Sequence, residues 1–209
     1  MAVAAKMGWK LHQMDVNTTF LNGVVEEVYV EQPQGFETHV CRLKKALYGL
    51  KQAPTMWYGI IEGFLKSMGF TKSKANSNLY YKVVEDEGPV ILLLYVDDLF
   101  LKSEEKLIDE CKKKIATEFE MKDLRQMHYF LGLEVWQNPK EIFLSQGKYA
   151  VEILKRFGMM DCKPMTTLMT TNLKLLNDTS SKIANATLFR QRIGLLMYLT
   201  NTRPNICLQ

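Results

Sequence analysis

The chain has 209 residues, a formal net charge of +4 and 47% hydrophobic residues. This hydrophobic share can fill a core, which excludes global disorder, and the length suits one large domain or a domain with a small extension. The mildly basic charge is compatible with a polyanionic partner without requiring one. The four cysteines and three histidines show no ligand spacing, so reduced thiols are expected and a zinc site is not.

The N-terminal third of the chain contains short predicted elements. Residues 1–6 are good helix formers that Gly8 ends, and they are too short in apolar length for a signal peptide or a membrane span. Residues 11–16 are predicted as a short strand, and residues 24–31 are rich in strand formers. A helix is then predicted from Pro54, with apolar residues at helical spacing and Gly69 just beyond its end.

The middle of the chain reads as strands followed by a helix. Strands are predicted at residues 78–84, 90–96 and 99–102, and Ser103 is expected to cap the next helix. The inner stripe of that helix recurs every four residues, at Leu107, Cys111, Ile115 and Phe119. The run of three lysines at 112–114 is interpreted as a solvated face of this helix rather than a phosphate contact.

The C-terminal third is predicted to be a hairpin and helices. Strands at 129–136 and 141–145 flank a turn, and a helix follows at 146–157. Residues 159–185 show no period and are expected to be mostly loop, before a last helix at 188–199. The element order indicates an α+β domain whose antiparallel sheet is backed by two helices, followed by a small helical extension.

Two adjacent carboxylates, Asp97 and Asp98, interrupt a run of strand-forming apolar residues at 92–101. A buried carboxylate is costly unless it is paired, so the run suggests a nearby cation. The alternative is a polar hairpin turn with both aspartates in water, which these ten residues alone favour slightly.

Asp15 is a candidate partner because it lies at the end of the predicted strand 11–16. If that strand lies beside the hairpin that carries Asp97, their carboxylates can converge. Oxygen ligands from two strand ends suit Mg²⁺, which takes one or two protein carboxylates together with substrate phosphates. An ordinary strand-end or helix-capping aspartate is the alternative.

Several segments in one order resemble the reverse transcriptase of copia-type long-terminal-repeat retrotransposons. The matching segments cover nearly the whole chain, and their collinear order is stronger than any one of them. They are MDV followed by Phe20, the run LKKALYGLKQAP at 43–54, YVDD at 95–98, YFLGLEV at 129–135, SQGKY at 145–149, KRFGM at 155–159 and LTNTRP at 199–204. One departure is Asn17-Thr18-Thr19, where the family usually has a Lys-Thr-Ala type segment.

The resemblance implies a right-hand polymerase palm, an antiparallel sheet backed by helices, followed by a small helical thumb or connection. The implied divisions are a palm at 1–125, a primer-grip-like hairpin at 126–145, and the thumb with the start of the connection at 146–209. The fingers are expected to be truncated at the N-terminus. The integrase and ribonuclease H parts of the Pol polyprotein are expected to be absent.

The resemblance also implies roles for matched residues. Asp15, Asp97 and Asp98 would be the catalytic carboxylates, and with the backbone of Val16 they would hold two Mg²⁺ ions. The remaining matched residues would contact nucleotide or nucleic acid. Those implied to bind the nucleotide are Phe20, Tyr48 and Gly49, and those implied to contact template or primer are Lys51, Tyr95, Phe130, Leu131 and Gly132.

Each nucleotide or template assignment has a plain structural alternative. Phe20 would bar a 2′-hydroxyl by steric clash, but a Phe after a strand is more often core. Tyr48 and Gly49 read equally as a turn before a helix, Lys51 as an exposed lysine, and the apolar hairpin residues as packing.

The implied reaction is RNA-directed DNA synthesis, in which a primer 3′-hydroxyl attacks the α-phosphate of a dNTP and releases pyrophosphate. The partners would be an RNA or DNA template-primer and dNTP, with no membrane, in a cytoplasmic virus-like particle or the nucleus rather than outside the cell. The alternative function is a non-catalytic remnant or a co-opted nucleic-acid-binding fragment. A phosphate- or metal-dependent hydrolase is a third possibility that no general-base spacing supports.

Overall fold

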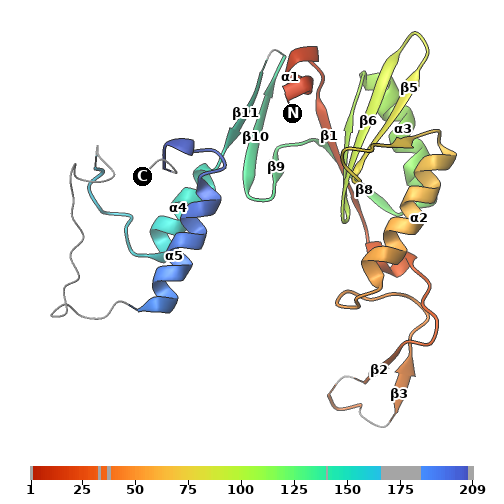
Figure 1. Ribbon diagram of the computed structural model, residues 1–209, viewed down its shortest axis with the longest axis horizontal. Coiled ribbons are helices and arrows are strands. Elements are labelled where there is room, and N and C mark those ends of the chain that lie inside the picture. Colours follow the sequence, from red (N-terminus) through yellow and green to blue (C-terminus); the bar gives the residue numbers. More distant parts are fainter. Residues whose placement is uncertain (1, 33, 37–38, 140, 166–184, 207–209) are drawn as a thin grey trace. The chain divides into compact units, whose positions relative to one another are not determined.

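The computed structural model describes residues 2–32, 34–36, 39–139, 141–165 and 185–206, with the side chains of residues 2 and 3 left out (Figure 1). The chain forms two compact units. The first contains Met1–Met127 and Asn138–Glu141, and the second contains His128–Gln137 and Ile142–Gln209.

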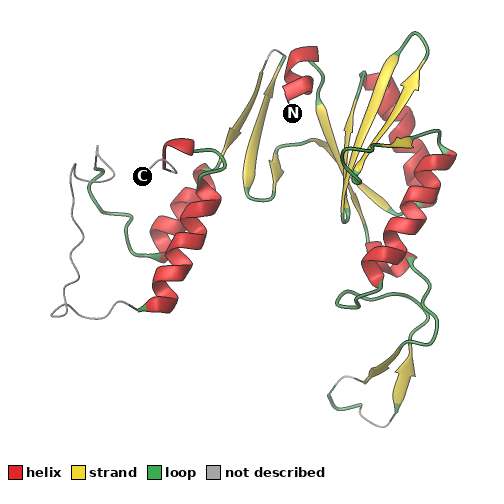
Figure 2. Ribbon diagram, in the orientation of Figure 1, coloured by secondary structure: helices red, strands yellow, loops and turns green. Residues whose placement is uncertain are grey.

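The first unit holds a six-stranded sheet, a separate two-stranded ribbon and, among its described residues, three α-helices (Figure 2). Its elements in chain order are α1 (Ala2–Met7), β1 (Leu11–Val16), the 3₁₀ turn η1 (Thr19–Asn22), β2 (Tyr29–Glu31), β3 (Val40–Arg42), α2 (Ala53–Ser67), β4 (Thr71–Lys72), β5 (Leu79–Val84), β6 (Gly88–Tyr95), β7 (Asp98–Lys102), α3 (Glu105–Glu118) and β8 (Met121–Gln126).

The six-stranded sheet has the order β4-β5-β6-β7-β1-β8, and every neighbouring pair is antiparallel. The first strand of the chain, β1, therefore lies between two strands that come more than eighty residues later. The condition for Asp15 to approach Asp97, that this strand lies beside the hairpin of Asp97, is met. The register places Met14 opposite Leu99 and Asp15 opposite Asp98.

Helices α2 and α3 pack on the same face of this sheet (Figure 1). The predicted inner stripe of α3 is buried, as are Trp57, Ile61 and Leu65 of α2. The helices cover alternate residues of the sheet strands, and these residues have almost no exposed surface: Leu92, Leu94, Leu99, Leu101 and Met14. Because successive strand residues point to opposite faces, Asp15 and Asp98 lie on the face away from α2 and α3.

Several sequence predictions differ from the structure. Helix α3 has Glu104 as its N-cap, and Ser103 instead donates its hydroxyl to the Pro89 carbonyl at 3.0 Å. Strand β8 was not predicted. Within the β-rich segment 24–31, only Tyr29–Glu31 form a strand, and Val24 makes an isolated bridge to Lys45.

The second unit contains a small sheet in the order β11-β10-β9 and two helices. Its elements are β9 (Tyr129–Phe130), β10 (Leu133–Asn138), β11 (Glu141–Ser145), α4 (Gly147–Arg156), α5 (Ala186–Leu199) and the 3₁₀ turn η2 (Pro204–Ile206). Both predicted helices are present, and α5 begins two residues earlier than expected. The predicted hairpin is present as β10 and β11, but the single strand predicted at 129–136 is divided into β9 and β10 by a turn at Leu131 and Gly132. Most of the predicted loop 159–185 lies outside the described residues.

A buried amide joins the two helices of this second unit. Gln146 is 1% exposed, donates to the Tyr198 carbonyl at 3.2 Å, and accepts from the Thr202 hydroxyl at 2.8 Å. The rings of Tyr149 and Tyr198 meet edge to face, with centroids 4.9 Å apart. These contacts dock α5 on α4 although α4 has no fully buried residue.

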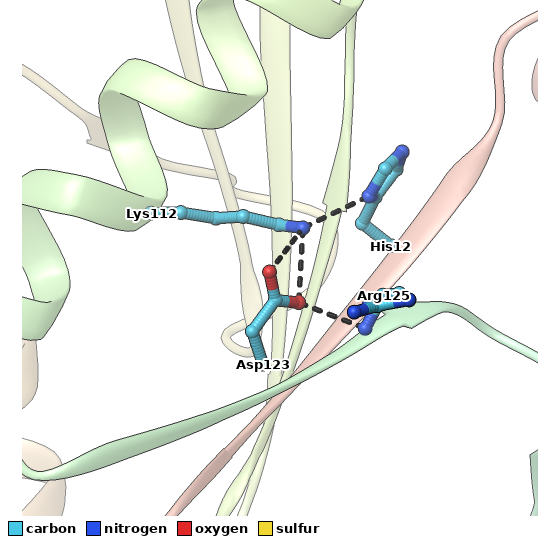
Figure 3. Close-up of polar contacts among 4 residues, drawn as sticks. All are labelled: His12, Lys112, Asp123 and Arg125. Carbon is cyan, nitrogen blue, oxygen red and sulfur yellow. Dashed lines mark hydrogen bonds and ion pairs between the residues drawn. The ribbon is translucent and has the colours of Figure 1, made fainter.

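The interpretation of the lysine run as a solvated face is wrong for one of its members. Lys112 is 8% exposed, and its ammonium lies 3.0 Å from both carboxylate oxygens of Asp123 and 3.0 Å from Nδ1 of His12 (Figure 3). Burial and the charge of Lys112 lower the pKa of His12. Although burial opposes it, hydrogen bonds from Lys112 and the Arg125 amide lower the pKa of Asp123. This cluster joins α3 to β1 and β8.

We predict that Lys112→Met lowers the free energy of unfolding by about 2 kcal/mol, because it removes the buried ammonium that contacts His12 and both carboxylate oxygens of Asp123. Lys113→Met, at an exposed neighbouring position, is the matched control and should change it by less than about 0.5 kcal/mol. Chemical denaturation of each variant measures the difference. Equal stabilities would show that the cluster contributes nothing net.

Candidate active site

The site is built where β1 ends and β7 begins. Asp15 and Asp98 face each other across this antiparallel pair, so their side chains share one face of the sheet with Cβ atoms about 5 Å apart. Tyr95 pairs with Asp98 across the β6–β7 hairpin, which leaves Val96 and Asp97 as a two-residue turn. The turn and the strand end thus place Asp15, Asp97 and Asp98 in one region of the sheet, and their roles stay a prediction.

The pKa values of Asp15 and Asp98 are both raised. Burial is the main reason that the pKa of Asp15 is raised, and the charge of Asp97 adds to it. Burial likewise raises the pKa of Asp98, with further contributions from Asp97 and Asp15. Lys122, which faces Asp15 from β8, partly opposes the shift at Asp15. Such mutual repulsion favours binding of a cation.

Gln13 supports Asp98 and was missed by sequence reasoning. Its side chain is 7% exposed, and Nε2 donates to the Asp98 carboxylate at 2.7 Å, which lowers the pKa of that carboxyl against the larger effect of burial. The available signal was its position two residues before Asp15, on the same face of the strand. A polar residue on the same strand face as a candidate carboxylate can be expected to donate a hydrogen bond to a carboxylate of the site.

The donor chemistry fits a hard divalent cation. Among the residues that the structure describes, no group of three or more His, Cys, Asp or Glu side chains is gathered closely enough to hold a metal ion. Mg²⁺ requires fewer, since it combines one or two carboxylates with water and substrate phosphates. Asp15 and Asp97, which are close enough for the charge of Asp97 to raise the pKa of Asp15, are the candidates for such a pair. The carbonyl of Val16, a third proposed ligand, accepts the Thr19 hydroxyl at 2.9 Å.

Two of the three residues predicted to bind the nucleotide, Phe20 and Tyr48, contact each other. The rings of Phe20 and Tyr48 have centroids 4.5 Å apart, although 28 positions separate them in the sequence. Phe20 is 7% exposed and belongs to the core, whereas Tyr48 is 60% exposed. Gly49 has φ +95°, a conformation that suits glycine, and a Cβ there would meet nothing within 4 Å.

The residues predicted to contact template or primer lie in both units. Lys51 and Tyr95 are exposed and belong to the first unit. Phe130 pairs with Leu133 in the second unit, and the turn between β9 and β10 is formed by Leu131 and Gly132, both with positive φ. A Cβ on Gly132 would approach the Tyr198 hydroxyl to 3.2 Å, so this hairpin packs closely on α5.

Comparison with known proteins decides the family. The model for "Reverse transcriptase (RNA-dependent DNA polymerase)" matches residues 1–171. The chain belongs to the copia-type reverse transcriptase family. The resemblance inferred from the motifs is therefore confirmed, and the mixed fold with a large antiparallel sheet is consistent with a reverse transcriptase domain.

Relatives match almost the full length of this reverse transcriptase domain. It is 37% identical to the retrovirus-related Pol polyprotein from transposon RE1 of Arabidopsis thaliana, over 99% of this chain but 14% of that protein. The Pol polyprotein from transposon TNT 1-94 of Nicotiana tabacum is also 37% identical, over 99% of this chain and 17% of its own length. A putative transposon Ty5-1 protein of Saccharomyces cerevisiae is 34% identical, over 92% of this chain and 65% of its own length.

The chain thus spans about one seventh of the RE1 polyprotein. In the described ranges of the chain, no helix is long and apolar enough to cross a bilayer.

We predict that Mg²⁺ stabilises the fold through the carboxylates. At 10 mM MgCl₂ and constant ionic strength, the wild type should gain about 2–4 °C in Tm, because an ion that binds only the folded state stabilises it. In the double variant Asp15→Asn, Asp97→Asn, the gain in Tm caused by Mg²⁺ should vanish. Without Mg²⁺, the Tm of this variant should exceed that of the wild type, because the repulsion between the two carboxylates is removed.

Scanning calorimetry measures both effects. Asp86→Asn, which makes the same chemical change in the β5–β6 turn, is the control and should keep the full gain. A Mg²⁺-dependent gain that persists in the double variant would place the ion elsewhere.

Proposed function

We propose that this chain is the palm and thumb part of an RNA-directed DNA polymerase, acting within a longer retrotransposon Pol polyprotein. The observation that carries the proposal is the register of β1 with β7, which sets Asp15 opposite Asp98 on the sheet face away from α2 and α3. Membership in the reverse transcriptase family supports it. The first unit would act as the palm, and the second as the primer-grip hairpin and the thumb.

The reaction would be attack of a primer 3′-hydroxyl on the α-phosphate of a dNTP, with pyrophosphate as the leaving group. Two Mg²⁺ ions, when bound, would supply the positive charge that stabilises the attacking and leaving oxygens. Asp15 and Asp97 would hold these ions, together with the backbone of Val16. Asp98, whose carboxylate is fixed by Gln13, would support the primer end and the charge balance. Positioning of both substrates lowers much of the barrier.

Aromatic side chains would select the sugar of the incoming nucleotide. Phe20 is held by the core on one side and by the ring of Tyr48 on the other, so its ring cannot retreat easily. A rigid ring under the sugar excludes a 2′-hydroxyl by steric clash. Gly49 would let backbone approach the nucleotide closely.

The remaining proposals concern nucleic acid and location. Lys51 and Tyr95, together with the hairpin residues Phe130, Leu131 and Gly132, would contact an RNA or DNA template-primer. The mildly basic charge suits that polyanionic partner. Integrase and ribonuclease H activities would come from other parts of the polyprotein, and synthesis would take place in a cytoplasmic virus-like particle or the nucleus.

Primer extension tests the catalytic proposal. On poly-rA with oligo-dT and Mg²⁺, the wild type should incorporate dTTP, and Asp97→Asn should lower incorporation by at least about a hundredfold, since it removes charge that positions the cations. Lys113→Met is a surface control that should retain full activity. Equal incorporation by the wild type and Asp97→Asn would overturn catalysis by this chain.

Sugar selection tests the assignment of Phe20. Phe20→Ala should lower the ratio of kcat/KM for dTTP to that for UTP by at least about tenfold, because the ring no longer bars the 2′-hydroxyl. Phe20 is also a core residue, so the variant will lose stability; taking the ratio within one variant cancels that general loss. An unchanged ratio in an active variant would refute the assignment.

A further inference from the structure

The turn that carries Asp97 has an unfavourable backbone. Val96 adopts φ +54°, and a β-branched residue in this left-handed region is a true outlier. The hairpin would accept glycine there without steric conflict. A conformation of this kind persists only where the surrounding structure enforces it.

Two hydrogen bonds enforce it. The indole Nε1 of Trp57 donates to the Val96 carbonyl at 2.6 Å, and the Val16 amide donates to the Asp97 carbonyl at 2.9 Å. The first carbonyl belongs to the peptide that precedes Asp97, and the second to the peptide that follows it. Both peptide planes next to Asp97 are therefore tied to other elements, which restricts the direction of its side chain.

The donor from α2 is itself rigid. Trp57 has no exposed surface, and its ring meets Phe119 edge to face with centroids 5.3 Å apart. The same helix buries Ile61 and Leu65 in the core of the first unit. An indole has one donor and no acceptor, so in this apolar setting the Val96 carbonyl satisfies its only polar group.

We propose that Trp57 is a positioning residue, whose N–H holds the strained Val96–Asp97 turn in the conformation that presents the Asp97 carboxylate. The expected effect on catalysis rests on the polymerase function proposed above. The restraint on the turn itself can be measured without activity.

The first experiment removes the donor and keeps an aromatic ring. Trp57→Phe should lower kcat for dTTP incorporation by about 10- to 100-fold with KM changed less than about threefold, since misplacement of a catalytic group affects the chemical step most. Trp9→Phe, which removes an indole N–H away from the turn, is the control and should leave kcat unchanged. Equal kcat in the two variants would overturn the proposal.

The second experiment reads the turn directly. Amide hydrogen exchange of the peptide spanning residues 95–98 should become at least about tenfold faster in Trp57→Phe, while α3 keeps its protection. If Trp57→Phe does not fold, replacement of Trp57 by β-benzothienylalanine, an indole isostere without the N–H, gives the same test. Unchanged exchange in a folded variant would refute the restraint, whatever the activity. Faster exchange in a chain that shows no wild-type incorporation would support the restraint and reject the proposed function.

The third experiment separates restraint from general packing. Glycine tolerates φ +54° without help, so the loss of kcat caused by Trp57→Phe should be several-fold smaller in a Val96→Gly background. Additive effects of the two substitutions would indicate that the indole N–H acts by some route other than the turn, and would overturn the proposal.

Discussion

The antiparallel pairing of β1 with β7 is the constraint from which the site follows. Met14 opposite Leu99 is buried beneath α2 and α3, so the next pair, Asp15 opposite Asp98, is directed to the other face. A slip of one residue would exchange the faces and bury carboxylates in the core, at a large cost. The apolar pattern that builds the core therefore also determines where the carboxylates are exposed.

This arrangement has a cost that neighbouring residues only partly offset. Burial and the charge of Asp97 raise the pKa values of Asp15 and Asp98, so the ionised cluster is less stable than separated carboxylates. Gln13 and Lys122 act against these shifts without cancelling them. A carboxylate cluster whose charge is only partly compensated attracts cations, and a phosphate would be held there only through such a cation, so complete internal neutralisation would remove the attraction.

Local sequence patterns predicted the strongly periodic helices and strands. They did not predict features that depend on contacts with residues distant in the sequence. The stripes of α2 and α3 repeat at helical spacing, and β6 is a nearly continuous apolar run, so these elements were predicted correctly. Strand β8 has the sequence MKDLRQ, which lacks an alternating apolar pattern, and it is a strand because β1 pairs with it. Lys112 is buried because His12, 100 positions earlier, and Asp123 come to it in the fold.

The candidate carboxylates of the site have a local sequence pattern, whereas the residues that support them make their contacts with residues distant in the sequence. The aspartates could be selected as candidates because acidic residues stand out among strand-forming ones, and the family motif implied their roles, which stay a prediction. Gln13 bonds Asp98 across 85 positions and Trp57 bonds Val96 across 39, so the sequence does not show either contact, although the position of Gln13 relative to Asp15 marks it as a polar residue on the same face.

Trp57 in particular reads as an ordinary core residue from its helical spacing, and that reading is correct for its ring. Its indole N–H has a further role, because it donates from the core to the carbonyl of Val96 in the strained turn that carries the candidate catalytic carboxylate Asp97. Through this one side chain, the rigidity of the packed core extends to the geometry of the site. Loss of packing around α2 would therefore disturb the turn before it unfolded the sheet.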